Sequence, residues 1–245
     1  MSFLNTLQFA ALQNEKLLAV LVDPDKFEEA KAAQFLRKLP KMTSFLLVGG
    51  STVEKEKTHL TVMALKKESE LPVILFPGDY EQISNAADGI LFLSLISGRD
   101  PEYLIEQHIK AVPLLKKSKL EIIPTGYVLI NGGRESAVER ISRTKPIFQE
   151  EEDKIVKTAL AGEYSGKQII YLEAGSGAAF SVNSEVISAV KNAISVPLFV
   201  GGGIRNREQL EAAWNSGADV VVVGTAFEEN EFSAFAGSEN HTLRE

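Results

Sequence analysis

The chain of 245 residues contains no cysteine and only three histidines. Without cysteine it has no disulfides, no thiolate nucleophile and no cysteine-ligated metal site. His59 and His108 fall in helical patterns and His241 lies in the C-terminal tail, so we expect no histidine metal cluster. No apolar run approaches the roughly 18 residues of a membrane span, and the N-terminus lacks the features of a signal peptide. We therefore expect no transmembrane segment and a cytoplasmic location.

Positive charge is also in short supply. Lysine and arginine number 26 against 33 acidic residues, which gives a formal net charge of −7. Nucleic-acid-binding proteins usually present a basic face, so this balance argues against a nucleic-acid partner. A local basic site for phosphate groups remains compatible with it. Hydrophobic residues make up 44% of the chain, which is enough to form a substantial core.

Short apolar runs alternate with helix-like segments along the whole chain. Runs such as Leu17–Val22 and Val220–Val223 show no polar alternation, which is typical of strands covered on both faces. The other expected strands are 44–48, 71–76, 89–93, 121–130 with a break at Pro124, 168–172 and 197–200. This pattern, without a composition break, predicts one (β/α)8 barrel domain over residues 1–245. An open doubly wound sheet is the alternative.

Three segments depart from the regular alternation of strands and helices. Residues 79–86 are expected to form only a short helix or a loop after the third strand. Residues 131–150 are polar, charged and unusually long for a barrel loop, which suggests a mobile lid. Residues 237–245 resemble a frayed tail.

Glycines follow the last two expected strands. Gly201, Gly202 and Gly203 end one strand, and Gly224 with Thr225 ends the next. Glycine lets backbone N–H groups approach an anion closely, and each turn is expected to open a helix. Phosphate sites after strands seven and eight recur in barrels of this kind. We therefore predict a phosphate cup here, with a tight packing turn as the alternative.

Oxygen-bearing side chains follow the first two strands. Asp23 and Asp25 lie in the turn Asp23-Pro24-Asp25-Lys26, and Ser51 follows two glycines. Because Mg²⁺ prefers hard oxygen ligands and shares them with phosphates, Asp23 and Ser51 are candidate metal ligands. The alternative for both sites is a structural turn in which Asp25 or Ser51 caps the next helix.

The sixth strand ends in Tyr171-Leu172-Glu173-Ala174-Gly175-Ser176-Gly177. Alternation along a strand directs Tyr171 and Glu173 to the same side. A carboxylate at a barrel mouth beside a flexible loop can bind hydroxyl groups and accept a proton. The alternatives are a solvated glutamate and a core tyrosine.

In combination, these segments resemble the geranylgeranylglyceryl phosphate synthase family, which also includes bacterial heptaprenylglyceryl phosphate synthases. The matching stretches occur in order as LVDPDK (21–26), LLVGGS (46–51), PTGYVLINGG (124–133), YLEAGSGA (171–178), VGGGIR (200–205) and VVVGTAFEE (221–229). The last two are shared with many phosphate-binding barrels, whereas the others are more specific in combination. Some members carry a lysine where this chain has Leu21. That departure suggests the archaeal-type branch, with Lys26 replacing the missing phosphate contact.

The resemblance implies transfer of a prenyl group from a polyprenyl diphosphate to the C3 hydroxyl of sn-glycerol 1-phosphate, with release of diphosphate. Geranylgeranyl diphosphate is the expected donor, and Asp23 and Glu173 are the expected catalytic residues. Asp23 and Ser51 are expected to hold Mg²⁺. The residues expected to bind glycerol phosphate are Tyr171, Leu172, Glu173, Ala174, Gly175, Ser176, Gly177, Gly202, Gly203, Gly224 and Thr225.

The prenyl chain needs an apolar groove, which we expect beside residues 76–80, where the third unit is short. We also expect a homo-oligomer and access of the product to a membrane surface. Two other functions stay open on the residues alone. One is a phosphate-binding isomerase or lyase of biosynthetic metabolism with Asp23 and Glu173 as its acid and base, and the other is a barrel that only binds a phosphorylated metabolite.

Overall fold

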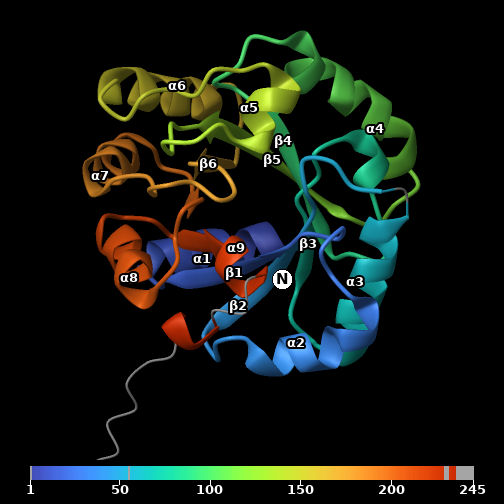
Figure 1. Cartoon of the computed structure of the whole chain (residues 1–245). Helices are drawn as coiled ribbons and strands as arrows, with labels where there is room; N and C mark the ends of the chain where they lie inside the picture. The colour runs from blue at the N-terminus through green and yellow to red at the C-terminus, as the bar shows by residue number, and fades with distance from the viewer. Residues whose placement is uncertain (1, 55, 229–231, 236–245) are drawn as a thin grey trace, which may run out of the picture.

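Eight parallel strands close into a barrel in sequential order (Figure 1). The structure is a computed structural model that describes residues 2–54, 56–228 and 232–235, so the predicted tail at 237–245 lies outside the described residues. The strands are β1 (Leu17–Val22), β2 (Thr43–Val48), β3 (Val73–Leu75), β4 (Gly89–Leu95), β5 (Glu121–Leu129), β6 (Ile169–Glu173), β7 (Leu198–Gly201) and β8 (Val220–Val223). Pairing of β8 with β1 closes the ring, which confirms the predicted barrel and rules out the open sheet.

Helices surround the barrel on its outside. They are α1 (Phe3–Leu12), α2 (Ala32–Lys38), α3 (Lys57–Glu68), α4 (Gln107–Leu115), α5 (Ala137–Ser142), α6 (Glu152–Tyr164), α7 (Ser184–Ala193), α8 (Arg207–Asn215) and α9 (Thr225–Glu228). Shorter turns are η1 (Glu29–Lys31), η2 (Tyr80–Gln82), η3 (Glu102–Glu106) and η4 (Phe232–Phe235). Between β3 and β4 the described chain forms only η2, as the short third unit predicted.

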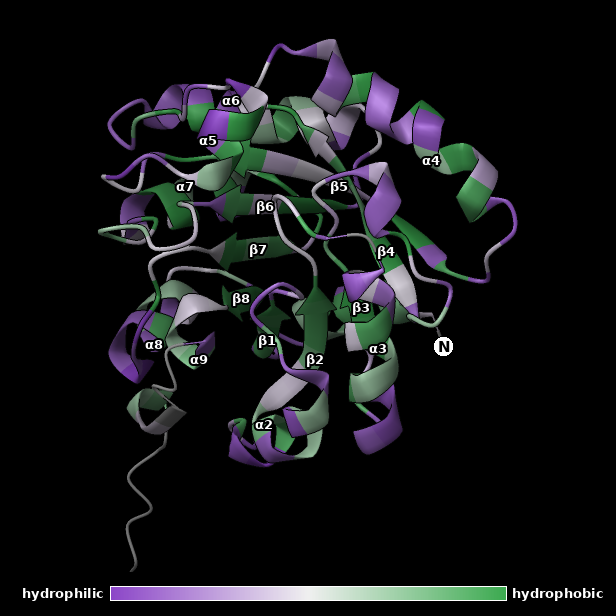
Figure 2. Cartoon of the chain, turned by 45° about the vertical axis from the view of Figure 1, so that its right-hand side comes forward, coloured by the Kyte–Doolittle hydropathy of each residue, from purple (hydrophilic) through white to green (hydrophobic). Residues whose placement is uncertain are grey.

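Side chains of the strands form two apolar layers. Residues such as Leu47, Ile74 and Phe199 point into the barrel, whereas Leu46, Leu172 and Val200 pack under the helices. Hydropathy follows this division, with apolar strands inside and polar helix faces outside (Figure 2). Both layers are buried, which explains why the strands read as continuous apolar runs.

Helix α1 closes the barrel at the N-terminal ends of the strands. Leu7 of α1 is buried in the inner layer, and the ring of Phe3 meets Phe45 edge-on at 4.9 Å. The Glu121 carboxylate accepts hydrogen bonds from the backbone N–H groups of Phe3 (2.6 Å) and Leu4 (2.9 Å). Glu121 thus caps orphan donors of the helix and fixes it to β5. The mouth at the C-terminal ends of the strands is left for ligands.

Two local predictions were wrong. Strand β5 runs through Pro124 without a break. The carbonyl of Pro124 accepts from Gln168 N at 2.7 Å, and Gln168 lies just before β6. The N–H that proline lacks is therefore missing only where the pairing with β6 begins. The second is the alternative in which Ser51 caps the next helix, because α3 begins only at Lys57, and Glu56 precedes it in a left-handed conformation (φ 69°). Ser51 therefore does not cap this helix, and its role as a metal ligand stays a prediction.

The long segment 131–150 is built into the barrel wall at both ends. It contains α5, and Ile147 pairs with Ile130 in an isolated bridge. Ser136 caps α5 by accepting from Glu139 N at 3.0 Å. The charged side chains Arg140 and Lys145 are exposed. The segment lies over the barrel mouth, and its motion as a lid stays a prediction.

Candidate active site

A polar pocket occupies the barrel mouth, and most of the predicted site residues line it. These are Asp23, Ser51, Tyr171, Glu173, Gly175, Ser176, Gly177, Gly202, Gly203, Gly224 and Thr225. Leu172 and Ala174 are buried in the outer layer instead, because alternation along β6 turns them toward the helices. Their side chains do not reach the pocket, and only their backbone lies near it.

Glu173 ends β6 and is 7% exposed. Its Oε1 accepts a hydrogen bond from Gly175 N at 2.7 Å, which fixes the carboxylate toward the pocket. Burial raises the pKa of Glu173, and the interactions of the carboxylate with the Tyr171 hydroxyl and with Gly175 N oppose that rise only in part. A carboxylate with a raised pKa is a better proton acceptor near neutral pH, so the position suits a general base.

Tyr171 is fully buried beneath Glu173, on the same side of β6. Its hydroxyl has no hydrogen-bond partner of good geometry among the residues that the structure describes. Burial and the neighbouring Glu173 carboxylate both raise the pKa of Tyr171, so the hydroxyl stays protonated. The Glu173 carboxylate lies beside this hydroxyl, and a ligand hydroxyl between the two side chains would complete the hydrogen bonding of both.

The first of the three glycines has a different role from the other two. Gly201 belongs to β7, and a Cβ there would clash with Tyr171 Oη and lie 2.8 Å from Glu173 Oε2. Gly201 therefore makes room for these two side chains rather than for a phosphate. Gly202 (φ 83°) and Gly203 (φ 73°) adopt left-handed conformations that favour glycine, and both line the pocket.

Hydroxyl groups complete the cup on the opposite side. Ser176 Oγ and Thr225 Oγ1 lie 3.1 Å apart and so bring the β6 loop to the start of α9. Arg205 also lines the pocket and is exposed, with its Nη2 donating to Ala178 O at 3.1 Å. Backbone N–H groups, two hydroxyls and a guanidinium form a suitable site for a phosphate dianion.

Asp23, at the end of β1, faces the turn that carries Ser51. A Cβ at Gly50 would lie 3.2 Å from Asp23 Oδ1, so the carboxylate lies directly beside this turn. Lys26 Nζ pairs with Glu228 at 2.8 Å and with Asp23 at 3.4 Å. Although burial opposes its charge, these two acids raise the pKa of Lys26. Asp25 instead accepts from Glu54 N at 3.1 Å, in agreement with a structural role.

No group of three or more acidic or histidine side chains suited to a metal occurs within the described ranges. Asp23 and Ser51 alone supply one carboxylate and one hydroxyl oxygen at the same pocket wall. This set fits Mg²⁺ only if substrate phosphates and water provide its other ligands, which is the usual arrangement for this ion. The residues present are therefore compatible with a metal that arrives with a diphosphate.

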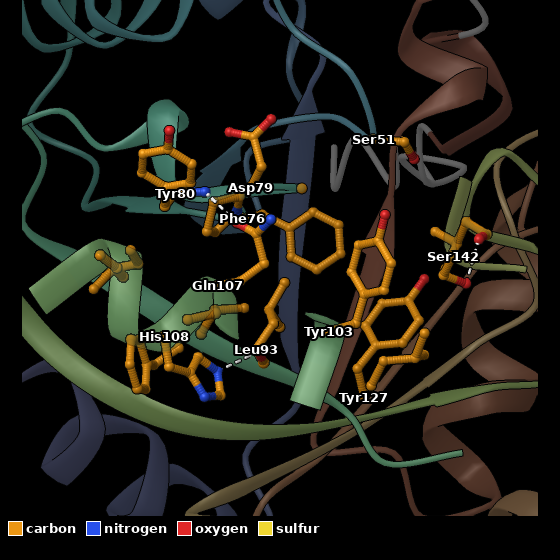
Figure 3. Close-up of a pocket in the computed structure, with 18 of the residues that line it drawn as sticks. Ser51, Phe76, Asp79, Tyr80, Leu93, Tyr103, Gln107, His108, Tyr127 and Ser142 are labelled. Carbon is orange, nitrogen blue, oxygen red and sulfur yellow. Dashed lines mark hydrogen bonds between the residues drawn. The ribbon is translucent and has the colours of Figure 1, made fainter. Parts of the chain in front are cut away.

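A second, apolar cavity adjoins the polar pocket on the side of the short third unit (Figure 3). Its lining comes from the β3 loop, η2, both faces of β4, η3, α4 and α5, and includes Ile83, Leu91, Tyr103, Ala111 and Ile141. The stretch Phe76–Tyr80 lies in its wall, as predicted.

His108 is the polar ring of this cavity wall. It stacks on Phe92 at 4.1 Å, and its Nε2 lies 2.7 Å from Leu93 O. Burial lowers the pKa of His108. The neutral imidazole donates to that carbonyl and adds no charge to the cavity wall.

The two cavities share one boundary. Gly50, Ser51, Phe76, Tyr127 and Val138 line both of them. The rings of Phe76 and Tyr127 lie 6.2 Å apart at this boundary, and each packs on Tyr171. A ligand with a polar end and an apolar end would cross here, beside Ser51.

Several lining residues were missing from the prediction. Arg205 lies inside the quoted motif VGGGIR, and its place directly after the glycines was a usable signal. No signal in the sequence identified Ser136 and Val138 of the long segment or Tyr127 of β5, because their position depends on how distant segments pack. Glu228 was visible only as part of a motif that many barrels share.

A closed (β/α)8 barrel with an anion cup joined to an apolar cavity defines a phosphate-binding barrel enzyme for an amphiphilic substrate. The chain belongs to the PcrB family, whose sequence pattern matches residues 11–239. A geranylgeranylglyceryl phosphate synthase of Zunongwangia profunda is 58% identical over 89% of this chain and 94% of the relative. A synthase of the same name from Thermococcus kodakarensis is 42% identical over 89% of this chain and 86% of the relative.

Solved structures agree with this assignment. The crystal structure of (S)-3-O-geranylgeranylglyceryl phosphate synthase from Thermoplasma acidophilum, in complex with sn-glycerol-1-phosphate, superposes with a TM-score of 0.88. It is 33% identical and covers 96% of this chain and 95% of its own. The resemblance that the motifs indicated is thereby confirmed.

Proposed function

We propose that this chain joins a polyprenyl diphosphate, with geranylgeranyl diphosphate as the first candidate, to the C3 hydroxyl of sn-glycerol 1-phosphate. The observation that carries the proposal is the shared boundary of the two cavities. One cavity suits a small phosphorylated polyol, and the other suits an isoprenoid chain. Their boundary is where the new ether bond would form. The relatives and the glycerol-phosphate complex described above support the same reaction.

The acceptor phosphate binds in the cup of Gly202, Gly203, Ser176 and Thr225. This position directs the glycerol hydroxyls toward Tyr171 and Glu173 at the floor of the pocket. Glu173 Oε1 is held by Gly175, so Oε2 is the oxygen available to the C3 hydroxyl. Holding the hydroxyl and the donor carbon in one orientation replaces a bimolecular encounter by a positioned reaction.

In the reaction, the C3 oxygen forms a bond to C1 of the prenyl group while the bond from C1 to the diphosphate oxygen breaks. The hydroxyl proton passes to Glu173, and diphosphate leaves with the electron pair. Lys26, beside Asp23 at the pocket wall, is placed to contact the departing diphosphate. The aromatic rings of Phe76 and Tyr127 exclude water from the donor carbon, which limits hydrolysis of the diphosphate.

We further propose that Asp23 and Ser51 hold Mg²⁺ together with the donor diphosphate. The ion would neutralise the charge that develops on the leaving group. Removal of divalent ions with a chelator should abolish turnover, and added Mg²⁺ should restore it. Binding of sn-glycerol 1-phosphate, measured by calorimetry, should persist in the chelator, because the cup contains neither proposed ligand.

An isomerase or lyase acting on a small phosphorylated metabolite needs the cup and an acid–base pair but has no use for the apolar cavity. The same holds for a barrel that only stores a phosphorylated metabolite. The direct test is incubation of the purified chain with Mg²⁺, sn-glycerol 1-phosphate and prenyl diphosphates of increasing length. Formation of an ether-linked phosphate is the expected result. Absence of any ether product with every donor would contradict the proposal.

The proposal extends to the assembly and the cellular setting of the chain. We expect the chain to form a homo-oligomer, which light scattering can measure. Across the described residues, no helix combines the length and hydropathy needed to cross a bilayer. A lipid product would then reach the membrane from the protein surface, and the reaction would take place in the cytoplasm.

A further inference from the structure

A buried glutamine joins the two loops that meet at the boundary of the cavities. Gln82, the last residue of η2, is 3% exposed and lies outside every motif quoted above. Its Oε1 accepts from Gly50 N at 3.3 Å and from Gly78 N at 3.2 Å, while its Nε2 donates to Gly50 O at 2.9 Å. One side chain thus makes three hydrogen bonds to the backbone of two loops.

The loops that Gln82 joins are packed backbone to backbone. A Cβ at Gly78 would clash with Gly50 O and lie 2.7 Å from Ser51 O. A Cβ at Gly49 would clash with Phe76 O. These close contacts hold the loop that carries Ser51 directly against the loop that forms the wall of the apolar cavity. Burial of a primary amide is unfavourable unless its oxygen and nitrogen are hydrogen-bonded, so the three bonds favour one relative position of the loops.

The opposite side of η2 is attached in a similar way to α4. Gln107 Oε1 accepts from Tyr80 N at 2.8 Å, and Figure 3 shows this bond in the cavity wall. Gln107 therefore positions the cavity wall, whereas Gln82 connects that wall to the Ser51 loop. Both glutamines bind the backbone around η2 and differ in which neighbour they hold, which makes Gln107 a matched control.

We propose that Gln82 is a positioning residue for the donor. It fixes the Ser51 loop against the apolar cavity, so that a prenyl chain in the cavity and its diphosphate beside Ser51 are held in the geometry that transfer requires. This inference rests on the proposed function and adds a residue to it. Gln82 touches neither the acceptor cup nor the reacting atoms, and it acts through Gly50 and Gly78.

The experiment compares Gln82→Met, Gln82→Glu and Gln107→Met with the wild-type chain. Gln82→Met keeps the length of the side chain and removes all three hydrogen bonds. We expect it to lower kcat by about tenfold or more, because misplacement of a reacting group is costly even when binding survives. The affinity for a non-reactive prenyl thiodiphosphate should fall, and that for sn-glycerol 1-phosphate should stay within about twofold.

Gln82→Glu supplies a test that a general loss of stability does not imitate. An ionised carboxylate accepts from Gly50 N and Gly78 N but cannot donate to Gly50 O, whereas a protonated one restores all three bonds. The kcat of Gln82→Glu relative to wild type, measured at each pH, should therefore rise as the pH falls. Gln107→Met should weaken donor binding, and its kcat relative to wild type should be the same at each pH.

Three outcomes would overturn the inference while leaving the proposed function intact. These are a wild-type kcat in correctly folded Gln82→Met, an equal loss of glycerol phosphate and thiodiphosphate affinity, and a pH-independent ratio for Gln82→Glu. If Gln82→Met does not fold, the pH ratio of Gln82→Glu decides alone. A wild-type chain without ether product would instead contradict the proposed function.

Discussion

The two cavities at the barrel mouth are built from different kinds of structure. Strand ends and glycine turns form the polar pocket, and closure of the barrel fixes their backbone. The apolar cavity is lined by side chains of η2, β4, α4 and α5, most of which lie beyond the ends of the strands. The walls of one site are therefore set by backbone hydrogen bonds of the barrel, and those of the other by side chains, which pack together and, at Gln82 and Gln107, hydrogen-bond to the loops.

This difference follows from what each ligand requires. A phosphorylated polyol is recognised by directional hydrogen bonds, which lose most of their value when an atom shifts by about one ångström. An isoprenoid chain is recognised by the apolar area that it buries, which changes gradually with shape. Substitutions in the polar pocket should thus have large and specific effects, and substitutions in the apolar cavity smaller and graded ones.

The largest expected effect is that of Glu173→Gln. Glutamine keeps the size of the side chain and can still accept from Gly175 N, but it cannot take the hydroxyl proton. We expect kcat to fall by roughly 10²- to 10⁴-fold. Calorimetry should show glycerol phosphate affinity within a few-fold of wild type. A small effect on kcat would remove Glu173 as the base.

The Glu173→Gln variant also tests how kcat depends on pH. Because burial raises the pKa of Glu173, the carboxyl loses its proton only above its ordinary range of about 4.3. The base acts in its ionised form, so the wild-type rate should rise with pH across a limb centred above that value. The Glu173→Gln variant should lack the limb in a plot of kcat against pH.

Asp23→Asn is expected to have the next largest effect. It removes a charge from the proposed metal site while keeping a similar shape, so kcat should fall by about 10²-fold with little change in glycerol phosphate affinity. Asp25→Asn is the control, because the Asp25 side chain accepts from Glu54 N, and the bond from Asp25 N to Asp23 Oδ1 comes from the backbone, which the substitution keeps. Equal losses of binding and turnover in Asp23→Asn would show that Asp23 belongs to the acceptor site instead.

Gly202→Ala should act on the cup itself. The new Cβ would clash with Glu173 Oε1 and lie 2.6 Å from Gly175 N, at a φ of 83°. We expect glycerol phosphate affinity to fall by about 10- to 100-fold. Gly166→Ala is the matched control, since Gly166 has a φ of 90° but no atom within 4 Å of its Cβ. Gly166→Ala should lower the melting temperature and keep the wild-type affinity for glycerol phosphate. If both variants lose the same affinity, backbone strain at a positive φ is the cause rather than the clash in the cup.

The smallest expected effect belongs to the apolar cavity. Ala111 lines it from α4 and is 4% exposed, so Ala111→Leu reduces the space for the prenyl chain. We expect KM to rise about tenfold for the longest donors and to change little for short ones. The short donors serve as the internal control. A uniform change across all lengths would mean that the chain does not reach α4.

The polar pocket could be predicted from the sequence in large part. Its residues lie where strands end, and parallel strands bring these ends together whatever the details of packing. Asp23, Glu173 and Gly202 were found in this way. The motif alone does not show which atoms face the pocket: the side chains of Leu172 and Ala174 face the helices, so that only their backbone can bind there, and Gly201 makes room for Tyr171.

The apolar cavity could be predicted only at its edge. Residues 76–80 were recognised because the third unit is too short for a helix. Ala111 and Ile141 were not, because they come from separate elements whose contacts depend on tertiary packing. Gln82 carries no local signature either, since a buried glutamine and an exposed one look alike in a sequence.

The short turn η2 has a consequence for the adaptability of this barrel. The other strands are each followed by at least one α-helix within the described chain, whereas β3 is followed by three residues of 3₁₀ turn. The apolar cavity thus lies where the barrel has a short turn in place of a helix, and no added domain forms it. A designer who grafts a helix into residues 77–88 would close the cavity and keep the cup, which would separate the choice of substrate from the chemistry in one scaffold.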